Sequence, residues 1–354
     1  MSFDLSDRAA RIPLLDEASR GRARARLGEL HAPPGSFGRL GELAAWMAAV
    51  QGRCPTAALT RVRLVCFAGD HGIAAGNVSA QPLTATRDRV RDLLGSGSTA
   101  VLADLTATGV RVVDVAVDAD ARRLPPQVRG HRIRRGSGRI DVEDALSRAE
   151  AEAAFSVGVS VADDEVDQGA DLLVAAGVGA ASSTPAATLV AVLTGKEVAA
   201  VVGRGSGVDD RGWMRKCAAV RDAARRGRRV LAGGGDMIDL LAAVGGADFA
   251  ALAGFVSQSA VRRTPLVLDG LVSTAAAAVA HRIGRRTLRW SVAGHASADP
   301  GHAALLDTLK LKPLVTFEIG RDDGTGALLA VPHLRAAAAL LAGPDTVDTA
   351  ASQP

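Results

Sequence analysis

Hydrophobic residues near the start of the chain recur at three- and four-residue steps between Leu27 and Val50. This spacing gathers apolar side chains on one face of a helix, so residues 1–50 are predicted to be largely helical. The segment 33–36, Pro-Pro-Gly-Ser, interrupts the pattern, and the hydroxyl of Ser36 is suited to cap the helix that follows.

Beyond this region, short apolar runs alternate with longer stretches of helical composition, such as 144–161 and 209–228. Each run closes on a small or polar residue, as a strand does where it meets a turn. The runs are 62–70, 110–117, 171–175, 198–202, 265–268 and 289–292. Strands that alternate with helices indicate βαβ units and a parallel sheet, and ligands bind beyond the carboxyl ends of such strands.

The chain shows no internal repeat and no linker, so a single α/β domain over 1–342 is predicted. Its helical N-terminal part is expected over 1–55, and the α/β core with a C-terminal helix over 56–342. The small and polar residues of 343–354 predict a disordered tail.

Composition then excludes several classes of protein. A chain of 354 residues that is 48% hydrophobic and 23% charged is globular, and with 3% aromatic residues we expect no nucleic-acid partner. The N-terminus carries charges where a signal peptide needs an apolar core, and no uncharged apolar run reaches the roughly 18 residues of a membrane helix. Three scattered cysteines give no disulfide framework. A cytoplasmic protein without a membrane partner is therefore expected.

Two titratable residues follow the first predicted strand, where Asp70 and His71 lie in a Gly-Asp-His-Gly sequence. One interpretation is a ligand-facing Asp–His pair. The other is a loop in which Asp70 caps a helix and His71 packs into the core. The residues alone leave both open.

A candidate anion site lies at 178–185, where Gly179, Ser182 and Thr184 lead into a predicted helix. Backbone N–H groups at a helix N-terminus lack intrahelical partners and attract anions. Ser, Thr and Pro also open ordinary helices, so this segment has a purely structural alternative.

A second glycine-containing loop, 203–210, lets the backbone approach a phosphate at Gly203 and Gly205, although it is neither a dinucleotide-binding nor a Walker sequence. Lys216 follows in the next predicted helix, and a lysine is a compact point charge suited to phosphate. A surface lysine and an ordinary strand-to-helix turn are the alternatives.

Titratable residues also gather in two late segments. The segment 294–302 contains His295, Ser297 and a second histidine, but its spacing fits neither a zinc site nor a nucleophile elbow, so no metal and no hydrolase is predicted. Asp322 and Asp323 precede Gly-Thr-Gly, where a carboxylate can serve as a general base. The alternative is a turn in which the carboxylates accept hydrogen bonds from backbone N–H groups.

Taken together, these segments resemble the nicotinate-nucleotide:dimethylbenzimidazole phosphoribosyltransferases of cobalamin lower-ligand synthesis. The resemblance runs from about Pro34 to Leu341 and rests on the order and spacing of the motifs. They are 34–40, 67–72, Ser79, 135–138, 179–195, 203–210, 242–253, 264–274, 294–302 and 323–327. The resemblance implies a Rossmann-like parallel sheet flanked by helices, a small helical region from the N- and C-terminal segments, a homodimer, and no cofactor or metal.

The resemblance also implies a reaction. The 5-phosphoribosyl group of nicotinate mononucleotide passes to a benzimidazole nitrogen, nicotinate leaves, and an α-ribotide forms. By position, Gly179, Gly205, Lys216 and Ser297 match family residues near the nucleotide's phosphate and ribose. The predicted nucleotide site also includes Ser182, Thr184 and Gly203 from the same segments. The family's general-base glutamate, in a Gly-Glu-Gly-Thr-Gly run, corresponds to Asp323, which is the predicted catalytic residue.

The acceptor side departs from the family pattern. Gly177 stands at a second acidic position, Gln81 at a common aromatic one, and Arg87 at a glutamine. Arg321 replaces an apolar residue, and Ser79 is kept. Buried unpaired charge beside a flat apolar ring is strongly disfavoured.

Three hypotheses follow from these departures. The first is the family reaction with Asp323 as base. The second is a phosphoribosyltransferase, or a nucleotide hydrolase, with a more polar or acidic acceptor. The third is a non-catalytic paralogue that binds a nucleotide or a partner, suggested by the loss of two acidic positions at once. Separately, Arg321 can pair with Asp322 or Asp323 and close the pocket, and a paired Asp323 would have a lowered pKa and be a weaker base.

Overall fold

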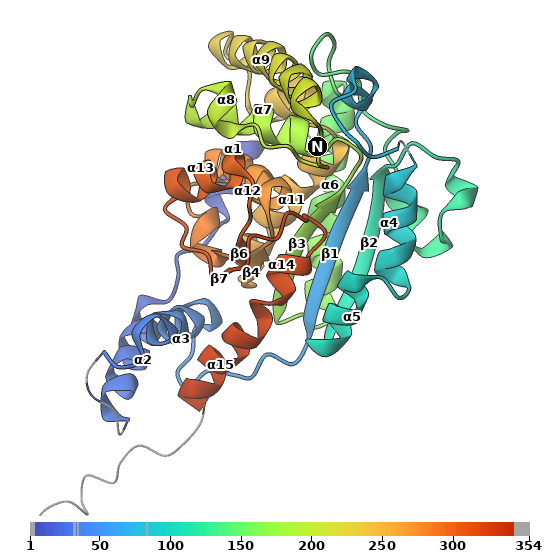
Figure 1. The fold of residues 1–354 in the computed structure, drawn as a ribbon. Coiled ribbons are helices and arrows are strands. Elements are labelled where there is room, and N and C mark those ends of the chain that lie inside the picture. Colours follow the sequence, from blue (N-terminus) through green and yellow to red (C-terminus); the bar gives the residue numbers. More distant parts are fainter. Residues whose placement is uncertain (1–3, 31–32, 34, 83, 343–354) are drawn as a thin grey trace, which may run out of the picture.

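The computed structural model describes residues 4–30, 33, 35–82 and 84–342. The predicted tail, 343–354, lies outside these residues. A five-stranded parallel sheet with strand order β2-β1-β3-β4-β5 forms the centre (Figure 1). Its strands are β1 (Val62–Gly69), β2 (Thr108–Ala116), β3 (Leu172–Val178), β4 (Leu266–Leu268) and β5 (Ser291–Ala293). The chain leaves β1 toward β2 and returns on its other side as β3, so the order reverses between β1 and β3, where open α/β sheets bind ligands.

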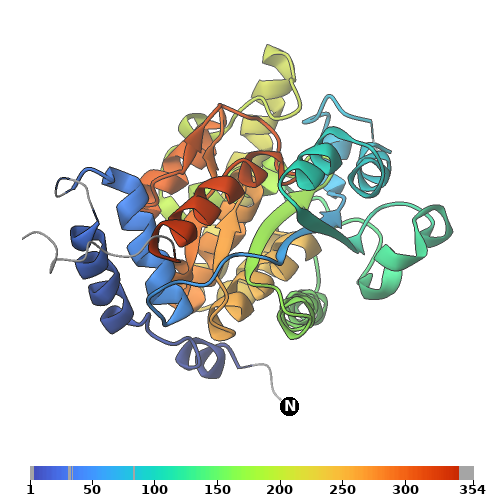
Figure 2. The same cartoon turned by 90° about the horizontal axis from the view of Figure 1, so that it is seen from below.

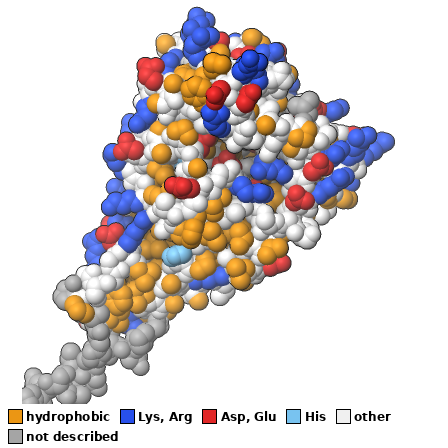
Figure 3. Space-filling model, viewed as in Figure 1, with side chains coloured by type: hydrophobic (Ala, Val, Ile, Leu, Met, Phe, Trp, Pro, Cys, Tyr) orange, Lys and Arg blue, Asp and Glu red, His pale blue; other side chains and the backbone are white. Residues whose placement is uncertain are grey.

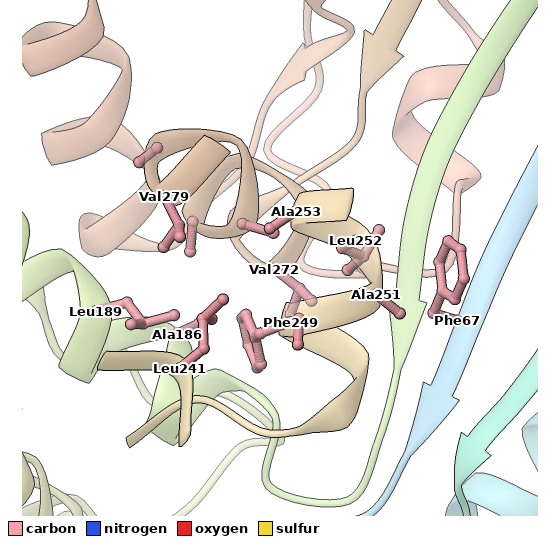
Figure 4. Close-up of a cluster of buried hydrophobic side chains, with 14 of the residues drawn as sticks. Phe67, Ala186, Leu189, Leu241, Phe249, Ala251, Leu252, Ala253, Val272 and Val279 are labelled. Carbon is pink, nitrogen blue, oxygen red and sulfur yellow. The ribbon is translucent and has the colours of Figure 1, made fainter. Parts of the chain in front are cut away.

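Alternate side chains of the sheet enter two separate hydrophobic cores, because successive residues of a strand point to opposite faces. Val65 and Phe67 of β1 belong to the first core, and Leu64 and Cys66 to the second. The first core also takes side chains from α6 (Arg148–Asp167), α7 (Ser183–Thr194), α8 (Val198–Val201), α9 (Asp210–Ala232), α10 (Met237–Val244), α11 (Ala247–Val261), α12 (Leu271–Ile283) and α13 (Pro300–Leu309). Figure 4 shows part of it, with Leu241, Phe249 and Val272 pointing toward one another.

The second core lies between the other face of the sheet and helices from both ends of the chain. These helices are α2 (Glu17–Glu29), α3 (Gly38–Gln51), α4 (Ala85–Leu94), α5 (Ser98–Leu105), α14 (Thr325–Leu328) and α15 (Val331–Ala342). α15 packs against α3 and α2, and both views show the C-terminal helix beside the N-terminal ones (Figures 1 and 2). The α/β fold with a small helical region built from the two ends of the chain is therefore confirmed.

The remaining elements connect these layers. A short helix, α1 (Leu5–Ala10), lies beside α12. Two further short strands, β6 (His295–Ala296) and β7 (Val315–Thr316), pair in parallel beside the main sheet. The short 3₁₀ turns are η1 (Gly72–Gly76), η2 (Ala121–Arg123), η3 (Pro126–His131) and η4 (Thr287–Trp290).

Three local predictions were wrong. The apolar run 198–202, expected as a strand, contains the short helix α8, because its side chains pack between α7, α9 and α13 instead of joining the sheet. The run 289–292 begins in the 3₁₀ turn η4 and becomes a strand only at Ser291. Ser36 does not cap α3, whose N-cap is Phe37 and makes no side-chain capping bond.

One stretch of the described residues, Thr325–Ala342, is long and apolar enough to span a membrane by length and composition. Half of it is buried inside the molecule, where α14 and α15 pack against α5 and α3. Hydrophobic side chains also gather over α14 and α15 on the face shown in Figure 3. Since a core helix passes the same test, the stretch is weak evidence for a membrane span.

Helices α6 and α11 cross so closely that their backbones touch. A Cβ added at Gly158 of α6 would lie 1.8 Å from the carbonyl oxygen of Ala251 in α11. The reverse contact is as close, since a Cβ at Gly254 would lie 2.1 Å from the carbonyl oxygen of Phe155. This crossing fixes α11 against the sheet, because α11 contacts β1, β2 and β3 on its other side.

We expect Gly158→Ala to destabilise the protein by about 1–3 kcal/mol or more, because a close-packed interior has no room for an added methyl group. Gly21→Ala in α2 is the matched control, since nothing lies within 4 Å of the Cβ it adds. That control should stabilise the protein by about 0.5–1 kcal/mol through helix propensity. Chemical denaturation of both variants measures the difference, and equal stabilities would contradict the close crossing.

Candidate active site

A cavity of about 450 Å³ opens at the carboxyl ends of β1 and β3, where the strand order reverses. Its walls come from five loops and helix starts that are distant in sequence. The lining residues are Ser79, Gln81, Arg89, Gly177, Gly179, Ala181, Ser182, Ser183, Val202, Gly203, Arg204, Gly205, Ser206, Trp213, Ser297, Ala298, Asp299, Pro300, Gly320 and Asp322. Most of the residues predicted for the nucleotide site are thus brought together in one cavity.

Asp70 supports the cavity from behind and does not line it. One carboxylate oxygen accepts hydrogen bonds from the hydroxyl of Thr86 and, at 3.2 Å, from the backbone N–H of Ala180. The other accepts from the backbone N–H of Asp118 at 2.7 Å. Burial raises the pKa of Asp70, although these hydrogen bonds oppose the shift. The structure therefore places Asp70 where it joins the ends of β1, β2 and β3.

His71 is also a packing residue in this structure. Its Nε2 lies 3.1 Å from a carboxylate oxygen of Asp248, and both side chains are buried. Burial lowers the pKa of His71, but the Asp248 carboxylate outweighs it, so the pKa of His71 is raised. Of the two interpretations left open by the sequence, the geometry of Asp70 and His71 favours the structural one, although Asp70 does not cap a helix as expected and instead joins the strand ends.

The cradle for an anion is built around a buried lysine. Lys216 of α9 is fully buried, and its Nζ donates hydrogen bonds to the Oγ of Ser183 at 2.9 Å and to the carbonyl oxygen of Gly203 at 3.0 Å. Burial lowers the pKa of Lys216, while the carboxylate of Asp299 opposes the shift. Ser183 and Gly203 line the cavity, so the ammonium group stands directly behind its wall.

The start of α7 completes this end of the cavity. Ser182 is the N-cap of α7 and makes no side-chain capping bond, and Ser182 and Ser183 both line the cavity. Thr184, predicted with them, lies outside the cavity wall, and its buried hydroxyl has no hydrogen-bond partner among the described residues. A helix N-terminus beside a buried ammonium group is a favourable place for a phosphate.

Ser297 lines the cavity and is held there by hydrogen bonds to His302, which in turn contacts Thr274. His302 Nδ1 accepts the backbone N–H of Ser297 at 3.2 Å and lies 2.9 Å from the Oγ of Ser297. Its Nε2 lies 3.2 Å from the hydroxyl of Thr274. Burial lowers the pKa of His302 to about 3, with a further contribution from His295. A neutral imidazole that accepts at Nδ1 therefore fixes the hydroxyl of Ser297 in the cavity wall.

His295 itself does not line the cavity. The ring is buried, and its Nε2 lies 3.4 Å from a carboxylate oxygen of Asp269. Burial lowers the pKa of His295, but Asp269 outweighs it and raises the pKa. Asp269 also accepts the backbone N–H groups of Gly324 and Ala327, each at 2.8 Å. His295 and Asp269 thus hold the Gly-Thr-Gly turn in place.

The two adjacent acids before that turn have different surroundings. Asp323 is 2% exposed, and its Oδ2 accepts from the guanidinium of Arg321 at 2.6 and 2.9 Å. Its Oδ1 accepts from the hydroxyl of Thr325 at 2.6 Å. Burial raises the pKa of Asp323, but these hydrogen bonds outweigh it and hold the pKa below its usual range. Asp323 lines a separate cavity of about 120 Å³, which differs from the expectation that it faces the nucleotide.

The residues predicted for the acceptor pocket are also split between different cavities. Ser79, Gln81 and Gly177 line the large cavity, whereas Arg321 does not. Arg87 also lies elsewhere, with its Nε 3.1 Å from a carboxylate oxygen of Asp88.

Sequence reasoning missed the wall residues Arg89 and Trp213 and assigned no role to Asp299; it named Asp322 as a possible general base but not as a residue of this cavity. Arg89 is two positions after Arg87 in α4, and residues two apart lie on different sides of a helix. The helical period of α4 could therefore have indicated that Arg89 and Arg87 point in different directions. Among the described residues, no group of three or more His, Cys, Asp or Glu side chains is placed to hold a metal ion.

Comparison with known proteins gives a consistent result. The family model described as phosphoribosyltransferase matches residues 12–351. The nicotinate-nucleotide–dimethylbenzimidazole phosphoribosyltransferase of Streptomyces avermitilis is 50% identical over 343 residues, which cover 96% of this chain and 91% of that protein. The protein of the same name from Mycobacterium ulcerans is 50% identical over 333 residues, covering 94% and 92%. A crystal structure of the enzyme so named from Thermus thermophilus matches with a TM-score of 0.88 at 35% identity, over 96% of this chain and 100% of that one.

The anion cradle can be tested with two glycines of one loop. Gly205 and Gly207 both have positive φ, +52° and +91°, so a side chain is strained at either. Only at Gly205 would the added Cβ meet the cradle, 2.5 Å from the Oγ of Ser183 and 2.8 Å from the Nζ of Lys216. We expect Gly205→Ala to abolish the rise in melting temperature that inorganic phosphate produces by binding the folded state, and Gly207→Ala to retain it. Equal phosphate effects in the two variants would argue against a cradle at Lys216.

Proposed function

The chain belongs to the phosphoribosyltransferase family, and from this premise we propose that it transfers the 5-phosphoribosyl group of nicotinate mononucleotide to a nitrogen of a benzimidazole-type acceptor. Nicotinate is released and an α-ribotide forms, as a step of cobalamin lower-ligand synthesis. The observation that carries this proposal is the cavity at the switch between β1 and β3, which joins the Lys216 cradle to a second, acid-bearing end. The names of the relatives support the choice of substrates.

The chemistry makes three demands on the site. The bond between the ribose carbon and the nicotinate nitrogen loosens first, and the acceptor nitrogen attacks the opposite face of the ribose, which inverts the anomeric carbon. The protein has to hold the phosphate, align the acceptor and remove the acceptor's N–H proton. The pyridinium is already an activated leaving group, so the reaction needs no cofactor.

The cavity offers groups for the first two demands. We place the phosphate at the start of α7, against Ser183, Gly203 and the Nζ of Lys216. The ribose then lies toward Ser297 and Asp299, which are in the same wall. The acceptor takes the part lined by Ser79, Gln81 and Gly177.

A more polar acceptor is the second candidate. Arg87 and Arg321, which suggested it from sequence, are both outside the cavity wall and paired with acids, so they place no charge against an apolar ring. Arg89 and Gln81 do line the cavity and favour an acceptor that carries a polar substituent. This observation keeps the second candidate beside dimethylbenzimidazole.

The oligomeric state and location are also proposals. A homodimer is supported by exposed apolar side chains on α5 and α15, two helices that α14 contacts. On α5, Val101 and Leu105 are 59% and 79% exposed, and Pro332 and Ala336 are exposed on α15. Light scattering of the purified protein at several concentrations measures the mass directly. A cytoplasmic location is proposed from the sequence alone, because the N-terminus is charged and the three cysteines are scattered.

Nicotinate release tests the activity. With nicotinate mononucleotide and dimethylbenzimidazole, the purified protein should release nicotinate and form the ribotide well above a heat-inactivated control. If a panel of polar azoles is turned over faster, the second candidate is preferred. Binding of nicotinate mononucleotide without turnover of any acceptor would contradict both and indicate a non-catalytic paralogue.

The cradle makes a quantitative prediction. Lys216→Met keeps most of the buried side chain and removes its terminal ammonium group, so we expect the Kd for nicotinate mononucleotide to rise about 10- to 100-fold, as for the loss of a hydrogen bond to a charged group. Calorimetric titration measures the change. Lys196→Met is the control, because Lys196 is exposed and should leave the Kd unchanged. If the Lys216 variant and the unaltered protein bind nicotinate mononucleotide with equal affinity, the placement of the phosphate beside Lys216 is contradicted.

A further inference from the structure

The reaction needs a proton acceptor at the cavity, and the wall contains two carboxylates, Asp299 and Asp322. Asp299 is the N-cap of α13, and one of its oxygens accepts the backbone N–H of Gly301 at 2.8 Å. It also faces the cation of Lys216 at the anion end. Asp322 is the remaining acid, and it lies on the loop before the Gly-Thr-Gly turn.

The backbone around Asp322 holds the side chain toward the cavity. The carbonyl oxygen of Asp322 accepts the backbone N–H of Gly177, at the end of β3, at 2.9 Å. Its carboxylate Oδ1 accepts the backbone N–H of Val272, in the first turn of α12, at 3.1 Å. Gly270 is required beside it, since a Cβ there would lie 2.4 Å from this oxygen. The carboxylate is thus fixed by one hydrogen bond to Oδ1, and Oδ2 accepts none from the described residues.

Asp323 cannot take the same role in this arrangement. Both of its oxygens are engaged, one by Arg321 and one by Thr325, and the side chain faces the smaller cavity. To accept a proton from a ligand in the large cavity, the buried Asp323 carboxylate would have to leave the guanidinium of Arg321, whose side chain is 45% exposed. Asp323 would then be a buried charge without its partner.

We infer that Asp322, and not Asp323, accepts the N–H proton of the acceptor; this inference rests on the proposed function. As one ring nitrogen of the azole forms its bond to the anomeric carbon, the bond from that carbon to the nicotinate nitrogen breaks and nicotinate keeps the electron pair. The proton on the other azole nitrogen passes to the free Oδ2 of Asp322. It is lost to solvent through the cavity after the products leave.

The charges that face Asp322 suit this role. Burial raises the pKa of Asp322 to about 7, and Asp269 after β4 and Asp299 of α13 add to the shift. The N–H of Val272 in α12 and His295 of β6 act in the opposite direction, and the cation of Lys216 in α9 also faces the carboxylate. A general base works best when its pKa lies near the operating pH.

The pH profile separates the two acids. Only the carboxylate form of Asp322 accepts a proton, so kcat/KM, which reports the ionisation of the free protein, should rise through pH 7 and level off above it. Asp323, whose pKa is held low, stays ionised over this range and contributes no inflection near pH 7. The azole acceptor also titrates, but its effect on the pH profile is the same for every variant. Comparing the variants with the same azole therefore isolates the effect of the protein's own groups.

We expect Asp322→Asn to lower kcat about 10²- to 10⁴-fold and to remove the inflection, while the Kd for nicotinate mononucleotide stays within a few-fold. Asp322→Glu should keep measurable turnover with the inflection. Asp322→Ala should regain activity when formate is added, which a purely structural role would not allow. Asp323→Asn is the matched control and should keep the inflection near pH 7.

The assignment is overturned if Asp322→Asn keeps the kcat and pH profile of the unaltered protein, or if formate fails to restore Asp322→Ala while that variant still binds nicotinate mononucleotide. It is also overturned if Asp323→Asn alone removes the inflection. Failure of the proposed function gives a different result, because the unaltered protein would then release no nicotinate with any azole.

Discussion

The site depends on one repeated constraint, a buried aspartate after a strand whose carboxylate accepts backbone N–H groups of a neighbouring loop. Asp70 after β1 holds Ala180 and Asp118 in this way, and Asp269 after β4 holds Gly324 and Ala327. A carboxylate that accepts several backbone hydrogen bonds fixes loops that have no other regular structure. Asp70 therefore sets the position of the loop before α7, and Asp269 sets the position of the Gly-Thr-Gly turn after Asp323. Neither aspartate lines the large cavity.

This constraint explains what the sequence could reveal and what it could not. The alternation of apolar runs and helical stretches predicted the parallel sheet, and the rule that ligands bind at its carboxyl edge located the cavity. The pattern could not say which acid at that edge faces a ligand, because the partners of Asp70 and Asp323 are set by tertiary contacts. The prediction of a strand at 198–202 was wrong for a similar reason, since periodicity cannot separate a short buried strand from a buried helical turn. Packing against α7, α9 and α13 favours the helix here. A match by position pointed to Arg87, whereas the direction of side chains along α4 puts Arg89 in the cavity wall.

The electrostatic design of the cavity follows from these positions. The buried ammonium of Lys216 lies at one end of the cavity, and the carboxylate of Asp322 lies at the other. The charge of Asp299 acts on both groups and raises the pKa of each. A cation beside a bound phosphate is favourable, and an acid of raised pKa beside an azole N–H is favourable for proton transfer. Arg321 contributes indirectly, because its pairing with Asp323 keeps a third carboxylate away from the cavity that Asp299 and Asp322 line.

The departures from the family pattern at Gly177 and Asp322 are best understood as one exchange. The resemblance places an acid at the first position and a glycine at the second, and here the two are reversed. The structure brings them into contact, since the N–H of Gly177 donates to the carbonyl oxygen of Asp322. A side chain at Gly177 would begin only 2.7 Å from the Cγ1 of Val272, the residue whose N–H holds the Asp322 carboxylate. Gly177 and Asp322 both line the cavity and are hydrogen-bonded to each other, so an acid at either position lies at the same end of the cavity, which argues against loss of catalysis.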